Sequence, residues 1–392
     1  MHLSRLLLAA CAAALLVAAP ARADVGAHLR AITQLGVDHG GTRAAGTPGA
    51  ERTVAYLVER LRAYGWQVTT QPVRFPSATE RTPAVLDTAV PGRDFVVARQ
   101  SGSGDATGRV RTILAERCRP SALRSLRKGE IALVPFLRCS PARAASLVQA
   151  RGGIGVLYDG GPGTFPLRPA LSTLAKVPVV IARSSVALLL SRSRAPVRLK
   201  VDMAVEQRTV ENVVAELPGS SRVVMAGGHL DSVPEGIGAN DNASGLAVLL
   251  DVAERLPAAK PRATVRLAFW NAEEQGLFGS AAYVRGLGQA ERRRIAAYLN
   301  FDMVGSPNGR TEVYDGDDAI ERALRDALPG REGETPIFED SDHAPFDRVG
   351  IPVGGVYTGG LEERRGRPRD PCYHRRCDGA SNVDVALATR VA

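Results

Sequence analysis

The sequence predicts an α/β fold: a mostly parallel, mixed β-sheet covered by helices on both faces, with a smaller β-rich domain inserted into it. From residue 212 onward, helical segments such as GLAVLLDVAERL alternate with apolar runs typical of buried strands, namely NVVAEL, VVMAGG, TVRLAFW, AAYLNF and IPVGGVY. Strands that are apolar throughout are buried on both faces, as in parallel sheets. The length of 392 residues also exceeds what one hydrophobic core usually supports, so we expect two domains or one large domain that carries an insertion.

The elements before residue 212 divide into two groups. Apolar residues at helical spacing predict one amphipathic helix through Leu29 and Ile32 and a second through Leu57 and Leu61, separated by the turn-rich HGGTRAAGTPG. The segment WQVTTQPVRF then predicts a strand. From about residue 80, short β-like runs alternate with Gly, Pro and Ser around one helix-like segment, ARAASLVQARG. We therefore expect an inserted domain over residues 81–208, with residues 24–80 and 209–392 forming the main domain.

The first 23 residues have the pattern of a secretory signal peptide. Arg5 precedes an apolar stretch over residues 6–19, and Ala21-Arg22-Ala23 offers a small-x-small cleavage site before Asp24. The apolar stretch is too short for a comfortable membrane span, which disfavours an anchor. A lipoprotein-type box, LAAC at residues 8–11, would leave only residues 6–10 as its apolar core. We expect a secreted, extracellular protein, without stable membrane association.

Charge and aromatic content argue against a nucleic-acid partner. The formal charge is +9, from 50 basic and 41 acidic residues, but aromatic residues make up only 5% of the chain. The arginines are spread along the chain rather than clustered between aromatics, which is typical of a solvated surface. We therefore expect no nucleic-acid binding.

Four cysteines remain after removal of the leader: Cys118, Cys139, Cys372 and Cys377. An even number in an oxidising compartment favours disulfides, and three pairings are possible. Cys372 and Cys377 suit a short loop-closing bridge within DPCYHRRC, and Cys118 with Cys139 would then close a second loop. Zinc binding is the competing use, but neither pair has CxxC spacing. We favour two disulfides.

Polar residues that could bind a metal follow several of the predicted strands. His229 follows the strand VVMAGG, with Asp231 two residues later, and Asp241 lies in a Gly-rich loop at the expected start of a helix. A lone histidine after a strand is more often structural than functional. The nearby Asp241, however, favours a ligand role, because sites in parallel sheets form beyond the carboxyl ends of the strands.

Further acidic residues end the next two strands. Glu273 and Glu274 follow TVRLAFW, where one carboxylate can bind a metal while its neighbour acts as a general base. Asp302 follows an apolar run, a position where a charge is costly unless it is paired or bound to a cation. His374 follows Tyr373 between two cysteines. Carboxylates with two histidines, in this order, suit a pair of zinc ions.

These motifs resemble those of the secreted di-zinc aminopeptidases, of the bacterial leucine aminopeptidase and aminopeptidase Y type. The family also includes glutamate carboxypeptidase and the transferrin receptor ectodomain. The resemblance covers residues 25–384 and is tight at GGHLDS, GANDNASG, AEEQGLFGS, LNFDMVGSP, SDHAPF, GIPVGG and DPCYHRRCD. It implies a zinc exopeptidase fold of the phosphorylase/hydrolase-like class.

The resemblance also implies a ligand set for two zinc ions per chain. His229 and Asp302 would hold one zinc, Glu274 and His374 would hold the other, and Asp241 would bridge them together with a water or hydroxide.

Roles for four further residues come from the same motifs. Glu273 would be the general base, and Tyr373 would hydrogen-bond the oxyanion of the tetrahedral intermediate. Asp231 would orient His229. His343 is expected to line or support the site rather than to bind metal.

The inserted block is similar to a protease-associated domain at KGEIALVPFLRC, GGIGVLYDGG and VPVVIARSS. It departs from that pattern before Cys139, where Leu137 and Arg138 replace the usual Arg-Gly. Any role of this domain in gating or substrate binding would rest on analogy alone.

The expected function is that of a monomeric zinc aminopeptidase that removes N-terminal, mainly apolar residues from peptides or proteins with a free N-terminus. Alternatives are a carboxypeptidase acting on acidic C-termini, a glutaminyl cyclase with one zinc, and a catalytically silent binding protein. The cyclase is disfavoured because all five ligands of a two-metal site are present, and the silent protein because no ligand is lost.

Overall fold

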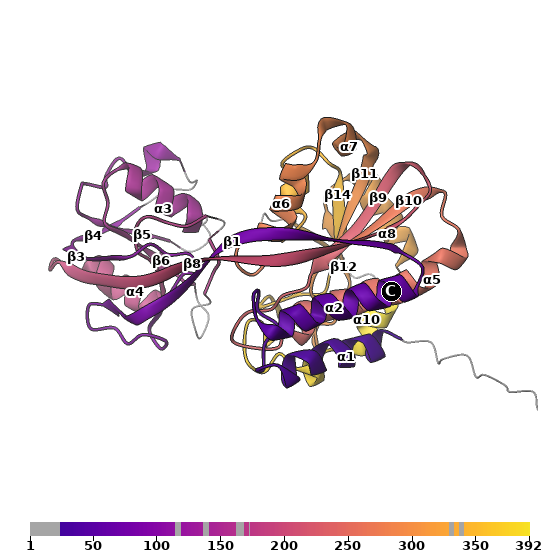
Figure 1. Cartoon of the computed structure of the whole chain (residues 1–392). Helices are drawn as coiled ribbons and strands as arrows, with labels where there is room; N and C mark the ends of the chain where they lie inside the picture. The colour runs from indigo at the N-terminus through magenta and orange to yellow at the C-terminus, as the bar shows by residue number, and fades with distance from the viewer. Residues whose placement is uncertain are drawn as a thin grey trace, which may run out of the picture.

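Among the described residues, a nine-stranded and a five-stranded β-sheet, each with its own helices, form the two main parts of the molecule. A pair of long antiparallel strands of the larger sheet extends toward the smaller one (Figure 1). The computed structural model describes residues 24–113, 119–135, 141–161, 168–171, 173–328, 333–336 and 341–392. The predicted leader and the predicted Cys118–Cys139 disulfide lie outside the described residues.

The larger sheet contains nine strands, in the order β1-β8-β10-β9-β11-β14-β12-β13, with β3 also paired to β8. Its central strands β10, β9, β11 and β14 run parallel, so their carboxyl ends share one edge of the sheet. The predicted mixed sheet is confirmed: its central strands are parallel, whereas β8 pairs antiparallel with β1, β3 and β10, and β12 pairs antiparallel with β14. The strands are β1 Gln67–Leu86, β3 Gly104–Gly108, β8 Val197–Leu217, β9 Ser220–His229, β10 Ala263–Trp270, β11 Ile295–Phe301, β12 Glu312–Asp315, β13 Gly333–Pro336 and β14 Val353–Tyr357.

Helices cover both faces of this sheet, and strand β10 shows why its sequence is apolar throughout. Leu267 and Phe269 pack into the core beneath α1, α2, α5 and α10, whereas Ala268 and Trp270 pack into the core on the α6 and α9 side. Successive side chains of a strand point to opposite faces, so both sets must be hydrophobic. The helices are α1 Val25–Asp38, α2 Pro48–Ala63, α5 Gly245–Ala259, α6 Phe278–Gly286, α7 Gln289–Arg294, α8 Asp318–Ala327, α9 Ala344–Asp347 and α10 Val385–Val391.

Short elements complete this part of the chain. They are the π-helical turn η2 Ala239–Ser244, the 3-10 turn η3 Ala380–Asn382, and the hairpin strands β15 Glu363–Arg364 and β16 Arg367–Pro368. No helix among the residues that the structure describes is long and apolar enough to span a membrane.

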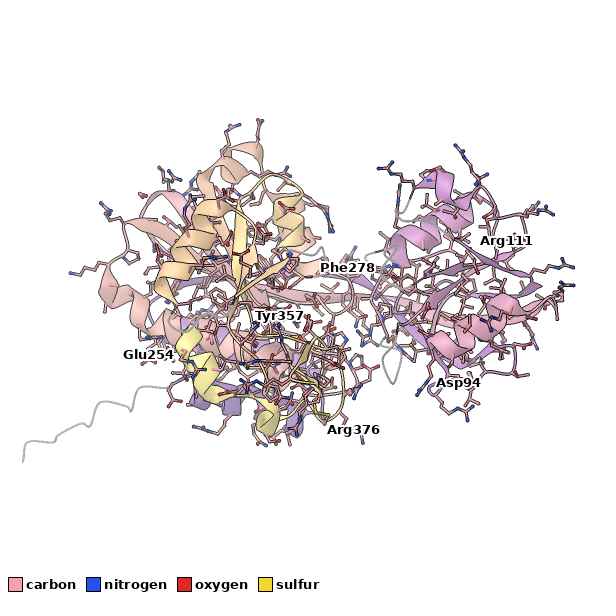
Figure 2. All side chains as sticks on the ribbon, turned by 180° about the vertical axis from the view of Figure 1, so that it is seen from behind. Asp94, Arg111, Glu254, Phe278, Tyr357 and Arg376 are labelled. Carbon is pink, nitrogen blue, oxygen red and sulfur yellow. A yellow bond between two sulfur atoms is a disulfide. The ribbon has the colours of Figure 1, made fainter. Side chains whose placement is uncertain are left out.

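The second sheet lies between β1 and β8 in the chain and has the strand order β2-β7-β6-β5-β4. It has a hydrophobic cluster on each face: Ala132 and Val134 face the cluster that includes α3, whereas Ile131 and Leu133 face the cluster that includes α4. Figure 2 shows this unit from behind, with Arg111 and Asp94 on its surface. Its elements are β2 Phe95–Val97, β4 Val110–Thr112, η1 Pro120–Leu123, β5 Ile131–Val134, α3 Pro141–Ala150, β6 Gly155–Asp159, β7 Val179–Ala182 and α4 Ser184–Arg192.

The long strands β1 and β8 pair from Gln67 opposite Glu216 to Leu86 opposite Leu199. They therefore run through both predicted domain boundaries, at residues 80/81 and 208/209, and carry the main sheet outward into the second unit (Figure 1). The assignment of that unit as a protease-associated domain stays a prediction.

A buried arginine in the turn between α1 and α2 holds the loop that follows β9. The guanidinium of Arg43 donates hydrogen bonds to the carbonyl oxygens of Leu230, Ile237 (2.9 Å) and Gly238 (2.8 Å). Burial lowers the pKa of Arg43 to about 10, so the side chain stays charged at neutral pH. Because the loop joins His229 to the η2 turn, Arg43 sets the spacing between these two segments.

We expect Arg43→Met to lower the free energy of unfolding by about 2 kcal/mol or more. The carbonyl oxygens of Leu230 and Ile237 lose their donor, whereas that of Gly238 keeps the N–H of Ala243, and each such loss costs about 1–3 kcal/mol. Urea unfolding followed by circular dichroism measures the change. The control is Arg52→Met at an exposed position of α2, which should shift stability by less than about 0.5 kcal/mol. Equal stability of the two variants would contradict this role of Arg43.

Candidate active site

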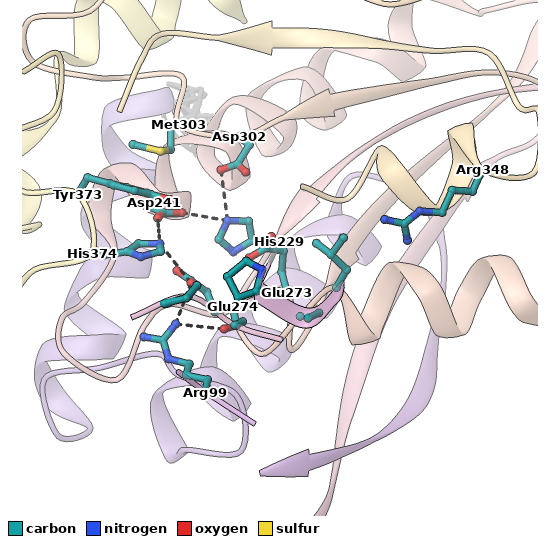
Figure 3. A pocket seen from close by; sticks show the side chains of 16 residues that line it. Arg99, His229, Asp241, Glu273, Glu274, Asp302, Met303, Arg348, Tyr373 and His374 are labelled. Carbon is teal, nitrogen blue, oxygen red and sulfur yellow. Dashed lines mark hydrogen bonds and ion pairs between the residues drawn. The ribbon is translucent and has the colours of Figure 1, made fainter. Parts of the chain in front are cut away.

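The five predicted metal ligands meet at the carboxyl edge of the parallel strands, as Figure 3 shows. Different elements supply them: His229 ends β9, Asp241 lies in η2, Glu274 follows β10, Asp302 follows β11, and His374 lies in the loop closed by the Cys372–Cys377 disulfide. This disulfide is the one that the spacing within DPCYHRRC predicted.

The ligand atoms form two groups that share the carboxylate of Asp241. Its Oδ1 lies 3.0 Å from His229 Nε2, and its Oδ2 lies 3.1 Å from His374 Nε2. Asp302 Oδ1 completes the first group at 3.2 Å from His229 Nε2, and Glu274 Oε2 completes the second at 3.3 Å from His374 Nε2. Within each group the three ligand atoms lie within 4.8 Å of one another. Asp241 therefore offers one oxygen to each group.

This donor set fits two divalent cations. Imidazole nitrogens and carboxylate oxygens are ligands that zinc accepts, and two buried carboxylates beside a third, partly buried one are costly without compensating positive charge. Glu274 Oε1 is buried and has no hydrogen-bond partner among the described residues, so it is free to bind an ion. Three features of the site therefore suit two bound cations: the types of ligand atom, the carboxylate that both groups share, and an oxygen without a hydrogen-bond partner.

Burial and mutual contact shift the pKa values of these groups. Burial raises the pKa of Glu274 to about 7. Burial acts on Asp241 in the same direction, but hydrogen bonds from the two imidazoles outweigh it and hold the pKa of Asp241 well below its usual range. Burial disfavours charge on His229 and His374, yet the surrounding carboxylates raise the pKa of both.

Asp231 contacts His229 through its backbone oxygen. The Nδ1 atom of His229 lies 3.0 Å from the backbone oxygen of Asp231 and 3.9 Å from its carboxylate. The carboxylate instead accepts hydrogen bonds from the backbone N–H groups of Glu273 (3.1 Å) and Glu274 (3.3 Å). Asp231 therefore links the histidine at the end of β9 to the two glutamates after β10.

Two buried aspartates tie the loop of His374 to the turn that carries Asp241. Asp378 accepts hydrogen bonds from the backbone N–H groups of Asn240 (2.9 Å) and Asp241 (3.1 Å). Asp370 accepts from the Asn240 side chain (2.7 Å) and from the N–H of Cys372 (2.8 Å). Sequence reasoning did not single out either aspartate, although both flank the Cys372 to Cys377 segment in DPCYHRRCD.

Glu273 and Tyr373 line a cavity of about 390 Å³ together with the five predicted ligands, which include His374. Burial raises the pKa of Glu273 well above its usual range. The ring of Tyr373 stacks on that of His374, with centroids 3.9 Å apart. His343 is buried and lines a neighbouring cavity, as expected for a lining residue.

Arg99, which sequence reasoning missed, also lines the main cavity. It follows β2 in the inserted unit, and its guanidinium contacts Glu274. Arginines are spread through the whole chain, so no pattern in the sequence distinguishes this one.

The comparisons with known proteins agree on one protein family. The model of peptidase family M28 matches residues 212–392. An aminopeptidase of Pseudomonas aeruginosa is 34% identical, over 88% of this chain and 74% of its own length. A probable lipoprotein aminopeptidase of Mycobacterium tuberculosis is 31% identical, over 91% of this chain and 80% of its own length.

Solved structures of similar fold include two bacterial enzymes. An aminopeptidase from Aneurinibacillus sp. strain AM-1 superimposes with a TM-score of 0.78 at 24% identity, covering 94% of this chain and 92% of that one. A zinc aminopeptidase from Bacillus subtilis gives a TM-score of 0.69 at 24% identity, covering 94% of each chain.

The metal-free protein should lose stability as the pH rises from about 5 to about 8. Burial raises the pKa of Glu274 and of Asp378 to about 7, from ordinary values of 4.5 and 3.8, so the folded state holds protons that the unfolded state has released. Their contribution is complete below about pH 4 and is lost as the pH rises through about 7. The raised pKa values of His229 and His374 act in the same direction. The lowered pKa of Asp241 opposes this trend only near pH 4 and below, and the pKa of His28, which burial lowers to about 4, opposes it between about pH 4 and pH 6.5.

Added zinc should reverse this trend, because the ligands bind metal in their deprotonated forms. Thermal unfolding of chelator-treated protein at several pH values, with and without zinc, measures both effects. A metal-free melting temperature that stays flat or rises across this range would contradict the assignment of these pKa shifts.

Proposed function

Because the chain belongs to peptidase family M28 and is an aminopeptidase, we propose that it is a secreted enzyme that uses two zinc ions to remove N-terminal, mainly apolar residues from peptides. The observation that carries the two-metal part is the carboxylate of Asp241, whose two oxygens each face one histidine. His229 and Asp302 would hold one ion with Asp241, and Glu274 and His374 would hold the other.

Glu273 is proposed to move the proton in the reaction. When bound, the metal ions supply positive charge that makes the attacking water more acidic and polarises the scissile carbonyl. Glu273 takes a proton from that water and passes it to the leaving amine as the scissile C–N bond breaks. Tyr373, held against the ring of His374, donates its hydroxyl proton in a hydrogen bond to the developing oxyanion.

Specificity for the N-terminus is proposed to come from the carboxylates around the cavity, which favour a protonated α-amine. Glu273 and Asp302 both line it. The neighbouring cavity of about 100 Å³ shares Asp302, Met303 and Tyr373 with the first and is lined further by Tyr314 and Tyr357. Met303, Tyr314 and Tyr357 form an apolar part of its wall, beside the polar Ser341, His343 and Glu362, and this part supports a preference for apolar side chains. We propose that a monomer suffices, because one chain supplies all the proposed catalytic groups.

Hydrolysis of a panel of free and N-acetylated aminoacyl-anilides by the mature protein tests this function. We expect cleavage of the free substrates only, fastest for apolar residues, lost on chelation and restored by zinc. Cleavage of the acetylated substrates would contradict an aminopeptidase. Two bound zinc ions without any cleavage would favour a carboxypeptidase or a silent binding protein, and one zinc with pyroglutamate formation would favour a cyclase.

Glu273→Gln should lower kcat by about 10²–10⁴-fold, because the amide cannot accept the proton. The variant should still bind two zinc ions, as measured by elemental analysis, because the amide keeps the shape of the side chain. Glu206→Gln, at an exposed position of β8, is the matched control and should keep full activity. Full activity of the Glu273 variant would rule out the assigned base.

Export is proposed from the leader at residues 1–23. Cleavage before Asp24 would leave this residue, whose side chain accepts a hydrogen bond from Ala27 N and caps α1, at the new N-terminus. The mass of the protein recovered from the culture medium should therefore correspond to residues 24–392. A lipid-modified N-terminal Cys11 on cell membranes would instead establish the lipoprotein alternative.

A further inference from the structure

We propose that Arg99, which belongs to the inserted unit, is a positioning residue for Glu274, so that this unit completes the catalytic site. The inference rests on the proposed two-metal function, in which Glu274 binds one of the zinc ions. It assigns the inserted unit a part in building the metal site, in addition to any contact that it makes with substrates.

The guanidinium of Arg99 contacts both the backbone and the side chain of Glu274. Its Nη1 donates a hydrogen bond to the Glu274 carbonyl oxygen (3.1 Å) and lies 3.5 Å from Glu274 Oε2. Its Nη2 donates to Glu235 Oε2 at 2.9 Å. Figure 3 shows Arg99 below Glu274, on the side away from Asp302. The Arg99 side chain is only 6% exposed, so water competes little for these contacts.

The neighbouring residue makes a second contact of the same kind. Gln100 Nε2 donates to Gln275 Oε1 at 2.9 Å, so two consecutive residues of the inserted unit meet two consecutive residues after β10. The Gln100 side chain is fully buried, and its Oε1 accepts a hydrogen bond from Leu171 N (3.3 Å) within the inserted unit. The backbone of Leu171 in the inserted unit therefore fixes the orientation of the Gln100 side chain that contacts Gln275.

The geometry of Arg99 suits positioning rather than neutralisation alone. Arginine donates in a rigid planar fork, which fixes the orientation of its partner, whereas lysine acts as a point charge. Arg99 Nη1 lies 3.5 Å from Glu274 Oε2, the same oxygen that lies 3.3 Å from His374 Nε2, so the guanidinium is next to the ligand oxygen itself. Hydrogen bonds of this kind to a ligand carboxylate orient it and raise metal affinity. Only the ion held by Glu274 and His374 should depend on Arg99.

The test compares Arg99→Met with wild-type protein by zinc competition against a chromophoric chelator and by steady-state kinetics. We expect Arg99→Met to keep one tightly bound zinc and to bind the other about 10–100-fold more weakly. At saturating zinc, kcat should fall while KM changes little. Arg99→Lys should lie between the two, which also provides a readout if the Met variant does not fold.

Two variants serve as matched controls. Glu235→Gln removes the other partner of Arg99, at a side chain that is 43% exposed, and should keep both zinc affinities. Arg111→Met removes an arginine of the inserted unit that pairs with Glu130 away from the site, and should behave like wild type. The first control shows whether loss of the Arg99–Glu235 ion pair alone weakens zinc binding. The second shows whether loss of an ion pair elsewhere in the inserted unit does so by lowering the stability of that unit.

Wild-type affinity for both zinc ions in Arg99→Met, or a rise in KM with unchanged zinc binding, would overturn the proposal. The second of these outcomes would mean that Arg99 contacts substrate instead. Failure of the proposed function itself is distinguishable, because wild-type protein would then bind fewer than two zinc ions or cleave no free aminoacyl substrate.

Discussion

The structure depends on the placement of several carboxylates in one buried site. The carboxylate of Asp241 lies within 4.8 Å of a carboxylate oxygen of Asp302 on one side and of Glu274 on the other, where water cannot solvate the charges fully. Such a cluster is stable only if imidazoles, backbone N–H groups or cations surround it. The features around the site follow from this constraint: one Asp241 oxygen faces each histidine, and Asp231 receives two backbone N–H groups.

The parallel strands bring the ligands to one edge, but separate contacts set their final positions. Arg43 holds the carbonyl groups of the loop between His229 and η2. Asp370 and Asp378 join the disulfide-closed loop to the same turn from the opposite side. These contacts are buried or partly buried, so water competes little for them, and they tie together the segments that carry His229, Asp241 and His374. This preorganisation lowers the cost of assembling the site.

The inserted unit has a direct connection to this site. The strands β1 and β8 carry the unit outward, and Arg99 and Gln100 then contact Glu274 and Gln275. A change in the orientation of the unit would therefore move the Glu274 carboxylate as well as the wall of the cavity. Hydrogen bonds between the inserted unit and the segment after β10 thus reach a residue that is proposed to bind one of the metal ions.

The sequence by itself determined the fold class, because strands buried on both faces must be apolar throughout, as in TVRLAFW, and because helices and strands have different periods. It also determined which residues end the central strands, including His229, Glu274 and Asp302, and it indicated the Cys372–Cys377 disulfide from its short spacing. Only the tertiary structure decided that Asp231 faces His229 through its backbone oxygen and that Arg99 contacts Glu274, 175 residues away. Periodicity and spacing report on neighbours along the chain, whereas these contacts depend on how distant segments pack, and a single buried arginine among many leaves no pattern in the sequence.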